Sequence, residues 1–76
     1  MDEEVFNLEV RKFLKHFGLT AQREIEKAVE AALRAGKLGG SETLSVSATI
    51  AIPGVLPTCD IGGRIALGGQ GASEKG

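Results

Sequence analysis

The chain has no tryptophan and no tyrosine, and its only aromatic residues are three phenylalanines. Large core-filling side chains are therefore scarce in a sequence of 76 residues. A chain of this size is already near the lower limit for a self-sufficient hydrophobic core. Small domains usually gain the missing stability from disulfides, a metal ion or a partner subunit. The remaining composition indicates which of these three is open to this chain.

Cysteine and histidine are also nearly absent, with one residue of each. The single Cys59 excludes a disulfide within the chain, and with His16 alone it cannot complete a typical zinc site. We therefore expect no metal and no other cofactor, and association between subunits is the route left. A lone thiol fits a reducing cytoplasm. The acidic start, Met1 to Glu4, differs from a basic signal or transit peptide, so the expected location is cytoplasmic.

Long apolar runs and an excess of one charge are missing too. No apolar stretch approaches the ~20 residues that span a bilayer, so we expect no membrane-spanning segment. The net charge of −1 argues against non-specific binding to nucleic acid. Residues 1–40 carry seven acidic and seven basic side chains, whereas only Glu42, Asp60 and Arg64 are charged between Ser41 and Ser73. The first part is typical of solvated helices and the second of a largely covered sheet.

The first forty residues predict two helices, over about 3–17 and 21–35, joined into an αα-hairpin by a link at 18–20. Asp2 and Thr20 are the expected N-caps, and Gly18 and Gly36 the expected C-terminal stops. The first helix carries an apolar stripe of Phe6, Val10, Phe13, Leu14 and Phe17. The second carries an inner face of Ala21, Ile25, Ala28, Val29, Ala32 and Leu33. The alanines leave room for the phenylalanines.

Residues 43–52 alternate apolar with small polar side chains and predict a strand, as do residues 58–67. Proline and glycine between them predict a turn over 53–57, so the strands form an antiparallel hairpin. Closing the hairpin there pairs apolar or small residues on one face: Ile52 with Cys59, Ile50 with Ile61, Ala48 with Gly63, Val46 with Ile65 and Leu44 with Leu67.

The uncharged strand 43–52 is an aggregation hazard unless its edge is covered, and an isolated two-stranded hairpin is marginal in water. Pairing this strand with its own copy gives a four-stranded sheet, while Asp60 and Arg64 mark the other strand as the solvent edge. We therefore predict an α+β fold of order ααββ that forms a homodimer through strand 43–52. The domain covers residues 1–67, and the glycine-rich tail 68–76 is expected to be disordered.

Two runs carry a family resemblance: Phe-Asn-x-x-x-Arg-Lys-Phe-Leu from Phe6 and Gln-x-Glu-Ile-Glu-Lys-Ala from Gln22. They resemble a family of short bacterial proteins known only as a domain of unknown function. The resemblance covers about residues 1–67 and leaves out the glycine-rich tail. It implies a bacterial cytoplasmic domain, and it assigns no catalytic or binding residue.

His16 and Cys59 are the residues to weigh for catalysis, as a general base or metal ligand and as a nucleophile. The simpler interpretation makes His16 a solvated residue favoured by the helix C-terminus. Cys59 is then a small hydrophobe opposite Ile52, with a redox role or an intersubunit disulfide as the alternative. No second histidine or cysteine is spaced to join them, so we prefer the simpler interpretation and predict no catalytic residue and no enzyme activity.

Two surfaces are candidates for binding. Val5 and Leu8 lie among charged residues, on the side of the first helix away from its phenylalanines. The polar face of the hairpin groups Ser45, Ser47, Thr49, Asp60 and Arg64. The glycine runs at 39–41 and 68–71 precede no helix, so we expect no convergence of their backbone amides on an anion.

The leading hypothesis is a non-enzymatic homodimeric module that binds a protein or a small ligand. The alternative is a nucleic-acid-binding regulator, because two helices and a hairpin resemble part of a winged helix. Arg23, Lys27 and Arg34 would then contact the nucleic acid, although Glu26 and Glu30 interrupt that face. The second alternative is a small enzyme with its site between subunits.

Overall fold

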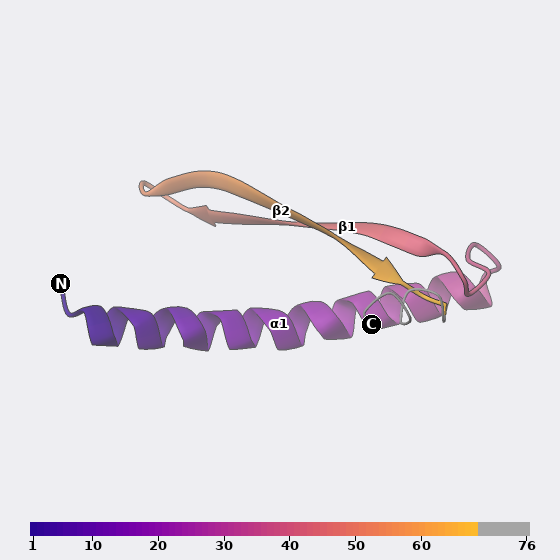
Figure 1. The fold of residues 1–76 in the computed structure, drawn as a ribbon, viewed down its shortest axis with the longest axis horizontal. Coiled ribbons are helices and arrows are strands. Elements are labelled where there is room, and N and C mark those ends of the chain that lie inside the picture. The colour runs from indigo at the N-terminus through magenta and orange to yellow at the C-terminus, as the bar shows by residue number, and fades with distance from the viewer. Residues whose placement is uncertain (69–76) are drawn as a thin grey trace. The chain divides into compact units, whose positions relative to one another are not determined.

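A computed structural model describes residues 1–68, which fall into two compact units, Met1–Lys37 and a second that begins at Leu38. The first unit holds one helix, α1 (Glu3–Arg34), and the second holds the strands β1 (Thr43–Ile52) and β2 (Leu56–Ala66). The two strands pair antiparallel (Figure 1). The α+β class and the order of helix before hairpin are confirmed. From residue 69 onward, the predicted glycine-rich tail lies outside the described residues.

The predicted helical hairpin is wrong, because α1 runs unbroken for 32 residues through the expected link (Figure 1). Gly18 is not among the glycines with positive φ, so it does not form the left-handed stop, and Thr20 is an interior residue rather than an N-cap. Glycine within a helix costs only about 1 kcal/mol relative to alanine. A break would give up the backbone hydrogen bonds of a whole turn, and no proline forces it here.

Both ends of α1 are capped as the sequence predicts. The Asp2 side chain accepts hydrogen bonds from the backbone N–H of Glu4 at 3.1 Å and of Val5 at 3.2 Å. At the other end Gly36 takes φ of 79°. Its N–H donates to the Leu33 carbonyl, and the Lys37 N–H donates to the Ala32 carbonyl at 2.9 Å. This pair of bonds is the Schellman motif, which satisfies carbonyls that the helix end leaves free.

The turn of the hairpin is tighter than predicted. The Val55 N–H donates to the Ile52 carbonyl at 2.9 Å, and Gly54 has φ of 81°. Proline followed by a glycine of positive φ matches the central pair of a type II turn. Strand β2 therefore begins at Leu56, two residues before the predicted Thr58, and ends at Ala66. The register has an irregularity where Pro57 and Thr58 face Ala51 alone. Proline is suited to a bulge because it has no N–H to donate.

The tighter turn shifts four of the five predicted pairs by two residues, and Ile52 faces Leu56 rather than Cys59. Ile50 faces Cys59, Ala48 faces Ile61, Val46 faces Gly63 and Leu44 faces Ile65. A shift of two keeps each side chain on its predicted face, since strand side chains alternate with a period of two. The bounds of β1 and the division into an apolar and a polar face are therefore confirmed, while the five predicted pairs are wrong.

Neither unit encloses a core within the described residues. No side chain of residues 1–68 is buried, and along β1 only the apolar positions are half-buried. The large hydrophobic residues of α1 are mostly exposed, including Phe6 at 52% and Phe13 at 53%. These exposed apolar residues are candidates for an interaction surface.

Candidate interaction surface

The hairpin brings the predicted polar residues together in direct cross-strand pairs. Ser45 lies opposite Arg64, and Thr49 lies opposite Asp60. The Thr49 Oγ1 hydroxyl donates to Asp60 Oδ1 at 2.8 Å, which fixes the carboxylate on this face. Ser47 lies between these pairs, opposite Gly62, which has no side chain to cover the Ser47 hydroxyl. The five residues form one exposed surface with hydroxyl, carboxylate and guanidinium groups in a row.

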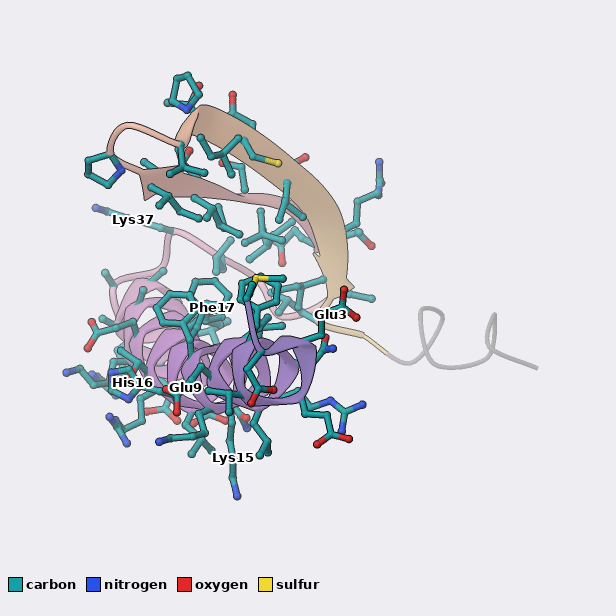
Figure 2. The ribbon with its side chains drawn as sticks, turned by 90° about the vertical axis from the view of Figure 1, so that its left-hand side faces the viewer. Glu3, Glu9, Lys15, His16, Phe17 and Lys37 are labelled. Atoms are coloured by element: carbon teal, nitrogen blue, oxygen red, sulfur yellow. The ribbon has the colours of Figure 1, made fainter. Side chains whose placement is uncertain are left out.

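The second predicted surface, Val5 and Leu8, is exposed at 53% and 60%. A broader apolar stripe, which contains the phenylalanines, lies on the opposite side of α1 from Val5 and Leu8. Figure 2 shows Phe17 projecting from the side of α1 opposite Lys15. The sequence predicted that these phenylalanines lie in a core, but no side chain of residues 1–68 is buried. They are the surface residues that the sequence interpretation missed, because it took an apolar stripe as proof of an intramolecular partner.

His16 lies in the middle of α1 and is exposed. Its predicted position at a helix C-terminus is wrong, since the helix continues to Arg34. Cys59 is a free, exposed cysteine of β2. Among residues 1–68, no group of three or more histidine, cysteine or acidic side chains is arranged to hold a metal ion.

One arrangement differs from the prediction, in the loop of the second unit that precedes β1. The Glu42 carboxylate accepts hydrogen bonds from the backbone N–H of Gly39 at 2.7 Å and of Gly40 at 2.9 Å. The amides of this glycine run do converge on an anion, so that prediction is wrong, and the anion is a side chain of the same loop. Gly40 has φ of 110°, a conformation that favours glycine. The signal in the sequence is a glutamate two residues after a pair of glycines.

These hydrogen bonds make the loop sensitive to pH. The backbone N–H of Gly39, followed by that of Gly40, lowers the pKa of Glu42 below its ordinary value. A carboxyl whose pKa is lower in the folded than in the unfolded state stabilises the folded loop at any pH above its unfolded-state pKa. This contribution is lost as the pH falls through the folded-state pKa. We expect the amides of Gly39 and Gly40 to lose hydrogen-exchange protection in that acidic range. In Glu42→Gln these two amides should lack this protection already at neutral pH. Protection equal to that of the wild type would contradict the role given to the Glu42 carboxylate.

The basic residues considered for nucleic-acid binding, Arg23, Lys27 and Arg34, do not lie on the second helix of a helical pair as predicted. The likeness to a winged helix required two helices, and the described residues contain one. Lys27 forms an ion pair with Glu24, with its Nζ 3.5 Å from the carboxylate oxygen. No arrangement in residues 1–68 favours this alternative over an interaction module.

Comparison with known proteins places residues 1–68 within the model of a family that is described as a family of unknown function. No curated protein and no solved structure matches the chain. Among the described residues, no helix combines the length and the hydrophobicity that a bilayer crossing requires.

Proposed function

The chain belongs to DUF6494, a family of unknown function, and from this premise we propose that it is a non-enzymatic interaction module that works as a homodimer. The observation that carries the proposal is the lack of a buried side chain in residues 1–68, beside so many exposed hydrophobic ones. Burying apolar surface is the main favourable term in both folding and association. A second copy supplies the surface that one copy lacks.

The hairpin offers a specific way to pair. It is a sheet of two strands, so β1 and β2 each have one unpaired edge. Strand β1 carries no charge over its ten residues, whereas β2 carries Asp60 and Arg64. Charged side chains protect a strand edge from pairing, and β1 lacks that protection. We therefore propose that β1 pairs antiparallel with its copy and that the dimer has a four-stranded sheet.

In this dimer the two polar faces extend one another. The row from Ser45 to Thr49 continues across the two-fold axis, with Asp60 and Arg64 at its outer sides. Such a surface suits a polar partner, either a protein segment or a small ligand with hydrogen-bonding groups. We propose that it acts in the bacterial cytoplasm, where a free thiol such as Cys59 stays reduced.

The proposed strand pairing predicts the effect of a lysine at Ser47. Within one chain this residue faces Gly62, so Ser47→Lys should leave the hairpin folded. Across the two-fold axis, strand pairing brings the two new lysines close together, and like charges opposite one another cost ~1 kcal/mol. We expect dimer dissociation to become about fivefold easier. Analytical ultracentrifugation across a concentration series measures it.

Thr58→Lys is the matched control, since it places the same charge on β2. It should leave the dissociation constant unchanged. A wild-type chain that stays monomeric at high micromolar concentration would end the proposal. A dimer weakened by Thr58→Lys but not by Ser47→Lys would move the interface to the edge of β2.

A further inference from the structure

Because α1 is continuous, the large apolar residues of its first half and the small ones of its second half do not pack against each other within one chain. Its first half carries large apolar residues on the stripe, including Phe6, Phe13 and Phe17, the last exposed at 38%. Its second half carries alanines on the stripe, at Ala21, Ala28 and Ala32. In a helical hairpin the two halves would fit together. A straight helix cannot fold back on itself, so the fit is available only between two chains.

On one unbroken helix the two halves share a single stripe. Apolar residues recur every eleven positions, as in Phe6, Phe17 and Ala28, and again in Val10, Ala21 and Ala32. An eleven-residue repeat corresponds to about 3.67 residues per turn, which keeps successive members near one face of the helix. The stripe therefore runs along most of the length of α1 rather than ending at Gly18.

We infer that α1 pairs antiparallel with the α1 of a second copy, with the stripes in contact and residue 19 at the centre. In this register Phe6 lies beside the partner's Ala32, Val10 beside the partner's Ala28, and Phe17 beside the partner's Ala21. Three of the five large residues of the stripe thus meet an alanine, while Phe13 lies beside the partner's Ile25 and Leu14 beside the partner's Glu24. A parallel pair would place phenylalanine on phenylalanine at one end and alanine on alanine at the other, and so leave a gap, which costs stability.

Charge favours the same orientation. Glu9 and Lys27 are separated by five full turns at about 3.6 residues per turn, so both lie on one flank of the stripe. Antiparallel pairing brings Glu9 near the partner's Lys27 twice in the dimer, whereas a parallel two-fold pair places this flank of the two helices on opposite sides of the contact and keeps the two residues apart. Their ion pairs within the helix, to Lys12 at 3.4 Å and Glu24 at 3.5 Å, are exposed and leave both groups accessible. Glu3 and Glu24 are the charged residues on the stripe, and Lys27 balances the charge of Glu24.

This inference rests on the proposed self-association and adds to it a second surface and an orientation. Its first test is Phe13→Asp in the full chain, since a carboxylate on the stripe would be buried without a partner in the dimer. We expect the dissociation constant to rise at least about tenfold. Leu8→Asp is the matched control, because it places the same charge on the opposite side of α1 and should leave the constant unchanged. Circular dichroism of both variants checks that the helix persists.

Orientation is tested by cross-linking in the Cys59→Ser background. Glu9→Cys and Lys27→Cys chains are oxidised separately and then as a mixture. The antiparallel pair predicts a disulfide between the two different chains on mixing, and little dimer of either chain alone. Disulfide dimers of each chain alone, or no cross-link between the two chains on mixing, would overturn the inference. Dimerisation that Ser47→Lys weakens and Phe13→Asp does not would overturn the helix pairing and leave the strand pairing standing.

Discussion

Leu19→Pro is expected to destabilise the protein by about 3 kcal/mol or more, the cost of a proline in a helix interior. Proline lacks the N–H that residue 19 donates within α1, and its ring clashes with the carbonyl four residues earlier, that of Lys15. Leu19 is 55% exposed, so the loss would come from the backbone rather than from packing. Urea unfolding followed by circular dichroism measures both the free energy and the helix content.

Leu19→Ala is the control for this substitution. It removes the same side chain but keeps the N–H, and alanine is the best helix former, so stability should change little. The two variants together distinguish a continuous helix from a helical hairpin. In a hairpin, residue 19 would sit in a link where proline is tolerated. Equal stability of Leu19→Pro and Leu19→Ala would therefore contradict an unbroken α1.

The continuity of α1 is also where the sequence was least informative. A glycine followed by a leucine and a threonine fits a helix stop and an N-cap, and Gly18 was interpreted that way. The same residues fit a helix interior at a small cost, and local pattern does not distinguish the two. Gly36 was identified correctly, and two further glycines, Gly39 and Gly40, follow it closely. The difference lies in what comes after each glycine: a segment with helical apolar periodicity follows Gly18, whereas a glycine-rich loop and an alternating strand follow Gly36.

In the hairpin, too, the sequence pattern predicted the bounds and faces of β1 but not the register. Alternation of residue types fixed the bounds of β1 and the face of every side chain, because a strand has a period of two. The register depends on where the turn closes and on one irregularity near Pro57, and neither leaves a periodic signal. Within the candidate surface, Ser45, Thr49, Asp60 and Arg64 were therefore grouped correctly. The hydrogen bond between Thr49 and Asp60 needed the register of the structure.

Gly18→Ala and Gly36→Ala are expected to change stability in opposite directions. A Cβ at either position would have no atom within 4 Å, so packing is not the cause. Gly18 has ordinary helical backbone, and alanine there should stabilise α1 by about 0.5–1 kcal/mol. Gly36 has φ of 79°, where an L-residue is strained, and alanine should destabilise by about 1–2 kcal/mol.

The loss at Gly36 extends beyond the residue itself. Its left-handed backbone positions the N–H of Lys37 on the Ala32 carbonyl, so strain there also weakens the cap. Gly36→Asn separates the two causes, because asparagine tolerates the left-handed region and should recover part of the loss. Denaturant midpoints of the three variants at one protein concentration give the comparison. A destabilised Gly18→Ala would mean that the helix is broken at residue 18, and the case for pairing along the whole of α1 would fall with it.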